Sequence, residues 1–417
     1  MQRRKLLKRF APLYVSSFFQ GLIFWYAIEK VFMVHIGFHS TTIALAVIIM
    51  NITSIVLNIP SGLLADRWSR KGVLGLSCIA LGLASFFLGM SGSVTDYVVA
   101  SCLYGAYSAF GAGAHDATIY DTLMEETGRR VGYEKYLGYT QFIEGVALII
   151  GSLCGAVIGE RLGLRAAYLI SVPSAGLAAA ALLAFRESTL HKQHRDATII
   201  AHLRTTLRAV FHKGDLTWIV IVLLSTTILY EFLLEVDQFW PLALKLGLLW
   251  YGPLNALLLF GYGIGSPLAS LIMKRRWLVM VSSLLGVVSV ALLMVRNMPL
   301  IALAQFSVIC LFVSLNTYAL GKLHDALPSE LRSSGSSMVA TLSATVFIPA
   351  LLIFSGITQY HSVFVAARML VPIALLAFWG VFVISRRQTY RNVEQFTLPI
   401  TIPSSPVVPQ QGTDMEL

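Results

Sequence analysis

The sequence predicts an all-α integral membrane protein, with twelve transmembrane helices in two pseudo-symmetric six-helix bundles. Three observations predict it: the composition, the spacing of apolar segments and the distribution of basic residues. Of the 417 residues, 56% are hydrophobic and only 12% are charged, about half the charged share of a typical soluble protein. The mean hydropathy of +0.74 excludes a water-facing surface over most of the chain. Lipid is therefore the solvent that this sequence fits.

Apolar segments long enough to cross a bilayer recur along the whole chain. A helix needs about 20 apolar residues to cross the hydrocarbon core. Backbone polar groups in lipid must be satisfied within the segment, which favours helices. The predicted spans are 11–34, 42–64, 72–91, 95–118, 138–160, 165–185, 216–238, 250–273, 277–296, 299–322, 335–357 and 362–385.

A long polar segment, 186–215, separates the sixth and seventh spans. Residues 1–185 and 216–385 are therefore expected to form the two bundles. Within the segment, 198–211 places apolar residues on one helical face and arginines on another, which predicts an amphipathic helix on the membrane surface; a solvated linker is the alternative. The tail, 386–417, has four prolines and few bulky side chains, and we expect it to be disordered.

Basic residues gather on one side of the predicted membrane. With the N-terminus inside, 25 of the 31 Lys and Arg residues fall in inner segments and four in outer loops. This asymmetry is the one that the positive-inside rule predicts, and it places both termini on the cytoplasmic side of the membrane. The basic N-terminal stretch precedes a segment long enough to span, so we expect a retained first helix rather than a signal peptide.

One inner loop, between the second and third spans, carries a dense group of charges. It reads "GLLADRWSRKG" (62–72), and it resembles motif A of the major facilitator superfamily, whose pattern is Gly-x-Leu-Ala-Asp-Arg-x-Gly-Arg-Lys. The matching charged and glycine residues are Gly62, Asp66, Arg67, Arg70 and Lys71. Ser69 replaces the second glycine. Span number, sidedness and the long central loop also resemble this family, and "GAGAHDATIYD" resembles its bacterial drug-efflux-like members.

The resemblance implies that this loop is a cytoplasmic gate between the two halves. Gly62 is expected to let two helices approach closely, and Asp66 to lie near the positive N-terminal end of the eleventh helix. Arg70 is expected to pair with Asp121, at the inner end of the fourth helix. The alternative, a positive charge that only anchors the loop inside, does not account for Asp66.

Acidic residues inside two spans are the first candidates for function, because ionisable groups are costly in a membrane. Glu29 lies in the first span, and Glu231 and Glu235 lie in the seventh, where their spacing puts them on one helical face. A carboxyl in a low-dielectric cavity can bind and release a proton near neutral pH. We expect Glu29, and then Glu235, to be the proton-binding groups.

Two alternatives remain open for these acids. Glu235, with Asp237, could simply reach the outer headgroup region and be solvated there. Glu29 could instead form a structural ion pair, either with Lys30 or with Arg368. The sequence alone does not decide between these interpretations.

The family resemblance implies a central cavity lined by the first, fourth, seventh and tenth helices. Further candidates for its wall are Tyr104, Tyr107, Glu144 and Asn316. The chain departs from many drug/proton antiporters at Ser101, which stands where they carry an arginine. The fifth span also lacks their proline. It has instead Gly151, Gly155 and Gly159, a spacing that favours close helix packing.

The sequence thus predicts a secondary carrier that moves a small amphipathic solute by alternating access, outward against proton entry. An uptake symporter or a uniporter is the alternative within this class, and a membrane sensor is the alternative outside it. The sequence has no metal-ligand spacing, glycine-rich phosphate loop or nucleophile motif. We therefore expect no enzyme activity, no metal, no cofactor and no nucleic-acid partner. The expected partners are the solute, the proton gradient and the lipid bilayer, and the expected state is a monomer.

Overall fold

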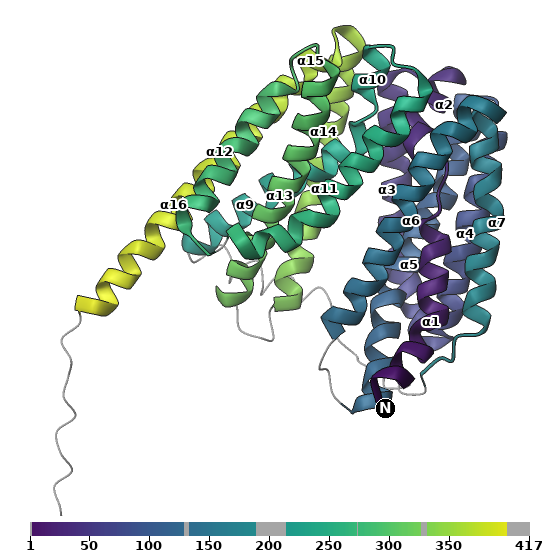
Figure 1. Ribbon diagram of the computed structural model, residues 1–417, viewed down its shortest axis with the longest axis horizontal. Helices are drawn as coiled ribbons and strands as arrows, with labels where there is room; N and C mark the ends of the chain where they lie inside the picture. Colours follow the sequence, from purple (N-terminus) through teal and green to yellow (C-terminus); the bar gives the residue numbers. More distant parts are fainter. Residues whose placement is uncertain (1, 129–132, 189–213, 273, 327–331, 398–417) are drawn as a thin grey trace, which may run out of the picture.

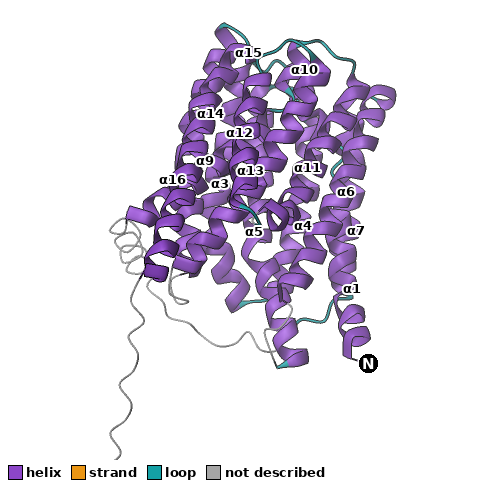
Figure 2. Ribbon diagram, turned by 60° about the vertical axis from the view of Figure 1, so that its left-hand side comes forward, coloured by secondary structure: helices purple, strands orange, loops and turns teal. Residues whose placement is uncertain are grey.

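A computed structural model describes residues 2–128, 133–188, 214–272, 274–326 and 332–397. Every regular element in these ranges is a helix, so the predicted all-α fold is confirmed (Figures 1 and 2). The predicted amphipathic helix at 198–211 lies outside the described residues.

The first half of the chain holds one broken helix and five long ones. Its elements are α1 (Gln2–Gly21), η1 (Tyr26–Ile28), α2 (Glu29–His35), α3 (Ser40–Arg67), α4 (Arg70–Met90), α5 (Val94–Thr127), α6 (Tyr133–Leu162) and α7 (Leu164–Leu183).

The second half repeats this plan, again with short helices beside long ones. Its elements are α9 (Gly214–Val236), α10 (Phe239–Ala243), η3 (Leu248–Trp250), α11 (Tyr251–Ile272), α12 (Arg276–Leu292), α13 (Met298–Ala326), α14 (Arg332–Tyr360), α15 (Val363–Ala366), η5 (Ala367–Met369) and α16 (Leu370–Thr397).

Each of the twelve predicted spans corresponds to a helical segment. Ten segments of the described chain are long and apolar enough to cross a membrane by length and composition. The other two predicted spans correspond to α5 and α12. Helix α12 is apolar but has only 17 residues. Helix α5 has 34 residues and carries charged side chains in its second half.

The first span is not the single helix that the sequence predicts. Helix α1 ends at Gly21, and the chain turns through η1 before α2 begins. The turn rests on α6: a Cβ at Gly155 would lie 1.7 Å from the Phe24 carbonyl oxygen, and one at Gly151 would lie 3.0 Å from that of Ile23. The Ser171 hydroxyl accepts a hydrogen bond from the Phe24 N–H. The predicted close packing of the α6 glycines is thus confirmed, and it accommodates the break.

The tail differs from the prediction at its beginning. Helix α16 continues to Thr397, so residues 386–397 are helical and the expectation of disorder is wrong for them. No glycine or proline interrupts the sequence between Gly380 and Pro399, and these are the residues that most readily end a helix. Residues 398–417 lie outside the described residues.

The two six-helix bundles converge at the end that carries α2, α10 and α15, and they diverge toward the end that carries the N-terminus (Figure 1). We call these the α10 end and the N-terminal end. The halves pack through α3 against α14 and through α6 against α11. At the second of these interfaces, a Cβ at Gly252 would lie 2.7 Å from the Ser152 carbonyl oxygen. The missing side chain therefore allows the two helix backbones to approach closely.

Candidate functional site

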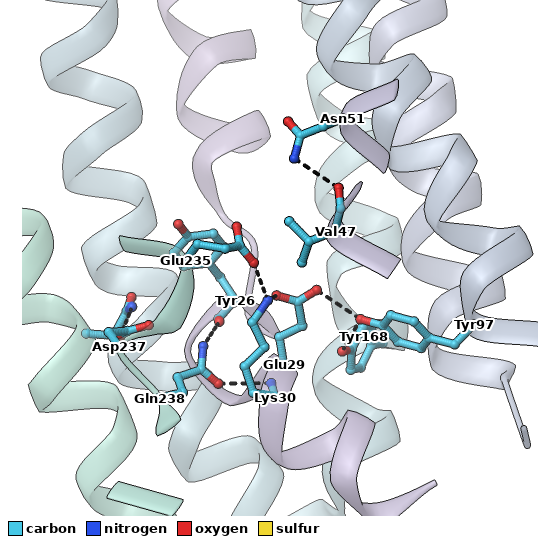
Figure 3. A network of polar contacts seen from close by, with 11 residues as sticks. Tyr26, Glu29, Lys30, Val47, Asn51, Tyr97, Tyr168, Glu235, Asp237 and Gln238 are labelled. Atoms are coloured by element: carbon cyan, nitrogen blue, oxygen red, sulfur yellow. Dashed lines mark hydrogen bonds and ion pairs between the residues drawn. The ribbon is translucent and has the colours of Figure 1, made fainter. Parts of the chain in front are cut away.

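A buried lysine joins two acids near the α10 end (Figure 3). The Lys30 Nζ donates to Glu29 Oε2 at 2.8 Å and to Glu235 Oε1 at 2.6 Å. The Lys30 side chain is only 3% exposed. Because Glu29 and Lys30 belong to α2 and Glu235 belongs to α9, this cluster connects the two halves. We call these three residues the Lys30 cluster.

The break in the first span positions Lys30. Its backbone N–H donates to Gln238 Oε1 at 3.0 Å, and Gln238 Nε2 donates to the Tyr26 carbonyl oxygen at 3.0 Å. Backbone groups near helix ends lack intrahelical partners, and here a side chain of the second half supplies them. The contacts of Gln238 with the turn therefore exist only while the two halves are together at this end.

Aromatic side chains hold Glu29 in place. The Tyr97 hydroxyl donates to Glu29 Oε1 at 3.0 Å and lies 3.2 Å from the Tyr168 hydroxyl. The Tyr168 ring stacks on Trp25 with a centroid distance of 5.0 Å, and Trp25 Nε1 donates to Ser85 Oγ. This network fixes the orientation of the Glu29 carboxylate toward Lys30.

The charges of the Lys30 cluster do not balance when both acids are ionised. Two carboxylates then face one ammonium, which leaves one net negative charge. A buried ion pair repays its desolvation only with good geometry and further hydrogen bonds. The cluster can therefore accept one more positive charge, either a proton or a cationic group of a ligand.

Two cavities adjoin the Lys30 cluster. The larger has a volume of about 190 Å³ and is lined by Met50, Asn51, Ile55, Glu231, Glu235, Ala344, Phe347 and Ile348. The smaller has a volume of about 40 Å³ and is lined by Trp25, Tyr26, Glu29, Met33, Ala46, Val47, Met50, Tyr97, Ser101, Tyr104 and Glu235. Glu235 lines both, so a ligand in the larger cavity reaches the acid that Lys30 holds.

Several predicted site residues do meet here. Glu231 and Glu235 line one cavity, as their shared helical face predicts. Tyr104 lines the smaller cavity, with its ring 5.3 Å from Trp25 and 5.3 Å from Tyr107. The predicted ion pair between Glu29 and Lys30 is also present.

Tyr107 itself lines neither cavity, and two further predicted residues, Asn316 and Glu144, are not among the lining residues either. Asn316 donates from Nδ2 to the hydroxyls of Thr226 and Thr227, at 3.0 and 2.8 Å, and so links α13 to α9. Glu144 is half-buried on α6, where its backbone oxygen meets α1 at Gly21. Neither side chain has a described contact with the Lys30 cluster.

Sequence reasoning missed Tyr97, Tyr168 and Gln238, and it did not select Lys30 as a site residue. The signal for Lys30 was a lysine inside a span, which by default suggests function. The other three carry no such signal, because tyrosine and glutamine are common near membrane interfaces. Their role follows from contacts between residues as far apart as Lys30 and Gln238.

The motif A loop at the N-terminal end keeps its predicted pairing. Arg70 pairs with Asp121 and donates from Nη1 to the Ala117 carbonyl oxygen at 2.8 Å. Glu187 accepts hydrogen bonds from the Ser69 hydroxyl at 2.7 Å and from the Arg70 N–H at 2.6 Å. These contacts bind the loop to α5 and to the chain after α7, all within the first half.

Among the described residues, the motif A loop has no hydrogen bond or ion pair with the second half. The Asp66 side chain is 66% exposed and lies 3.7 Å from Arg70 of its own loop, rather than against the start of α14. A Cβ at Gly62 would meet nothing within 4 Å, so the predicted close helix approach there is wrong. The reason is the divergence of the two bundles at this end (Figure 1). Arg67 is exposed, and Lys71 Nζ donates to the carbonyl oxygens of Leu183 and Phe185.

Among the described residues, no three His, Cys, Asp or Glu side chains lie close enough together to hold a metal ion.

Comparison with known proteins identifies the family. The family model of the Major Facilitator Superfamily matches residues 10–349. The inner membrane transport protein YajR of Escherichia coli (strain K12) is 26% identical over 167 residues, 39% of this chain and 35% of that protein. The match thus spans only about a third of that relative's length.

Solved structures share the fold at low sequence identity. A point mutant of the nucleoside transporter NupG has a TM-score of 0.74 at 12% identity, over 90% of this chain and 99% of the other. The xylose transporter XylE from E. coli, in an inward open conformation, has a TM-score of 0.63 at 12% identity, over 88% and 95%.

The chain belongs to the Major Facilitator Superfamily. It is a multi-pass integral membrane protein with the fold of this family.

Proposed function

We propose that this protein is a proton-coupled antiporter that exports a small amphipathic cation by alternating access. It would act in a bacterial inner membrane, as a monomer, without enzyme activity. The distribution of Lys and Arg supports a cytoplasmic N-terminal end. The α10 end then faces outward, and the divergence of the bundles at the N-terminal end corresponds to an inward-facing state.

The ion pair between Lys30 and Glu235 carries the proposal. It joins the two halves at the α10 end, at 2.6 Å. It requires an ionised Glu235, so it would stabilise the closed outer end while Glu235 holds neither a proton nor a cationic solute. A proton or a cationic solute on Glu235 would compete with Lys30 and release the halves. A ligand shifts such an equilibrium only through its different affinity for the two states.

This arrangement favours exchange over symport. An antiporter must not change conformation while empty, because each empty transition would dissipate the gradient. A symporter must return empty after each delivery. A contact that holds the empty, deprotonated form in one conformation therefore fits an antiporter and would slow a symporter.

The larger cavity indicates the class of solute. Its walls combine the carboxylates of Glu231 and Glu235 with the apolar side chains of Met50, Ile55 and Phe347. Carboxylates favour a positive charge, and apolar walls favour an apolar body on the same molecule. The volume of about 190 Å³ is below the ~300–1,000 Å³ typical of pockets for drug-sized ligands. A small amine with one apolar group fits these limits.

Motif A would serve as the inner gate of this cycle. Arg70 and Asp121 form an ion pair within the first half. The Asp66 side chain is 66% exposed in this conformation. On closure of the inner end, Asp66 would approach the start of α14, where a helix N-terminus favours a carboxylate.

Proteoliposomes test the direction of coupling. Purified protein is reconstituted, and accumulation of a panel of small amphipathic amines is measured under pH gradients of both signs. The proposal predicts accumulation only when the interior is acidic, because protons leaving then drive the amine inward. Accumulation only with an acidic exterior would indicate symport. If neither gradient causes accumulation, but the amine still exchanges across the membrane without a pH gradient, the protein would be a uniporter.

A further inference from the structure

Asp237 is a second buried acid at the junction of the two halves, apart from the Lys30 cluster. Asp237 directly follows the last residue of α9, and it is only 4% exposed. Its Oδ2 accepts a hydrogen bond from Asn255 Nδ2 at 3.1 Å. Its Oδ1 is buried and has no hydrogen bond of normal geometry to any described residue, although the Gln238 backbone N–H also faces the carboxyl group. The cavities described above do not include Asp237 among their lining residues.

Asp237 is connected to the other half of the protein. Asn255 of α11, 2% exposed, accepts through Oδ1 from the Ser152 hydroxyl of α6 at 2.9 Å. The backbone oxygen of Asp237 accepts from Gln305 Nε2 of α13 at 3.3 Å. The chain from Asp237 through Asn255 to Ser152 therefore crosses the interface between α6 and α11. It forms only when the two halves meet.

The surroundings of Asp237 do not neutralise a charge on it. The charged groups that face it are Lys30 of α2 and Glu235 of α9, and the titratable phenols nearby are Tyr26 of η1 and Tyr251 of α11. Lys30 already forms ion pairs with Glu29 and Glu235. Figure 3 draws no interaction between Asp237 and Lys30. An ionised carboxylate with an unpaired buried oxygen is far more costly than a neutral carboxyl in the same place.

We propose that Asp237 is a proton-binding site of the outer junction: its carboxyl is neutral while the α10 end is closed. When that end opens, water reaches the carboxyl, and its proton leaves to the external phase. When the end closes again, one carboxylate oxygen takes up one proton from the same phase. The proton is not carried across the membrane, and external acid favours the closed junction.

This proposal deepens the proposed function and rests on it for the opening of the α10 end. The two acids oppose each other in their response to pH. Protonation of Glu235 would release Lys30 and favour opening, whereas protonation of Asp237 favours closing. The two acids can therefore be told apart by whether a lower pH opens or closes the α10 end. This measurement involves no transport.

The test measures the distance across the α10 end by pulsed electron spectroscopy at a series of pH values. Spin labels replace Thr95 and Asn297, which are exposed at this end of the first and second halves, in a background without the native cysteines. The Glu235→Gln change removes the opposing effect. In this background the closed fraction should rise as the pH falls, and the closed-to-open ratio should change by up to about tenfold per pH unit, the limit for one proton.

Addition of Asp237→Asn should abolish this pH dependence and keep the junction closed, because asparagine resembles the neutral acid in shape and hydrogen bonding. The matched control is Asp96→Asn, an exposed acid at the same end, which should leave the pH dependence unchanged. The proposal is overturned if the double variant keeps the full pH dependence. It is also overturned if Asp237→Asn opens the junction or prevents folding. Loss of transport with an intact pH response of the junction would count against the antiporter instead.

Discussion

The ammonium of Lys30 in the first half lies 2.6 Å from a carboxylate oxygen of Glu235 in the second half, although 205 residues separate them. This contact lies at the end where the bundles converge, beside the cavity that Glu235 also lines. One acid thus takes part in both a ligand cavity and a link between the halves. We propose that occupation of the cavity and opening of the junction are coupled through this single side chain.

Replacement of Lys30 should uncouple the carrier. In Lys30→Met, the empty form can open at the α10 end, so a pH gradient imposed on proteoliposomes should decay faster than in wild type without any solute. Arg165→Met is a suitable control, since Arg165 is at the same end and, among the described residues, its side chain donates to the Ser91 carbonyl oxygen. A decay rate equal to that of the control would contradict this role of Lys30.

The pair formed by Arg70 and Asp121 should contribute to stability. Their side chains are 14% and 13% exposed. Loss of one partner of a buried ion pair costs about 3–5 kcal/mol of stability. Because both side chains keep some exposure, we expect a loss near the lower end of that range. Asp121→Asn should therefore lower the Tm of the detergent-purified protein clearly. Asp66→Asn, at a 66% exposed side chain, should change it little, because surface changes are usually within about 0.5 kcal/mol. Equal effects of the two changes would contradict the assignment.

The glycines of α6 should differ in their tolerance of alanine. A Cβ at Gly155 would lie 1.7 Å from the Phe24 carbonyl oxygen, whereas one at Gly145 meets nothing within 4 Å. Gly155→Ala should thus destabilise the protein by about 3 kcal/mol or more, the upper range for overpacking. Gly145→Ala should be neutral or stabilise by up to about 1 kcal/mol through its helix propensity. Thermal unfolding of both variants in one detergent gives the comparison.

The hydroxyl of Tyr97 should matter more than its ring. Tyr97→Phe keeps the packing but removes the hydrogen bond to Glu29, and bonds to charged groups contribute about 1.5–3 kcal/mol. We expect a lower Tm for Tyr97→Phe than for wild type in the same detergent. Tyr107→Phe provides the control, because Tyr107 contacts Tyr104 by its ring. A Tm equal to that of the control would argue against a stabilising role of the hydrogen bond to Glu29.

The sequence predicted the features that follow from local pattern. Span positions follow from hydropathy, and the shared face of Glu231 and Glu235 follows from helical spacing. The pair of Arg70 and Asp121 was implied by the family motif. The packing of Gly155 was expected from glycine spacing, but its partner at Phe24 was not.

The features that the sequence did not predict depend on contacts between distant segments or on conformation. No proline at Gly21 signals the break in the sequence. The break is stabilised by α6 and by Gln238 from the other half. Asp237 was expected at the outer headgroups as readily as inside. It is buried, and its hydrogen-bond partner Asn255 is 18 residues further along the chain. The expected approach of Asp66 to α14 depends on which end of the carrier is closed, and a sequence is the same in both states.

The most direct test of the central claim measures whether Glu235 holds the α10 end closed. Spin labels at Thr95 and Asn297 report the distance between the halves in the ligand-free protein at neutral pH, for wild type, Glu235→Gln and the control Glu160→Gln, an exposed acid on α6. The account predicts one short distance for wild type and for the control. It predicts an added population at longer distance for Glu235→Gln. Identical distance distributions for all three proteins would contradict it.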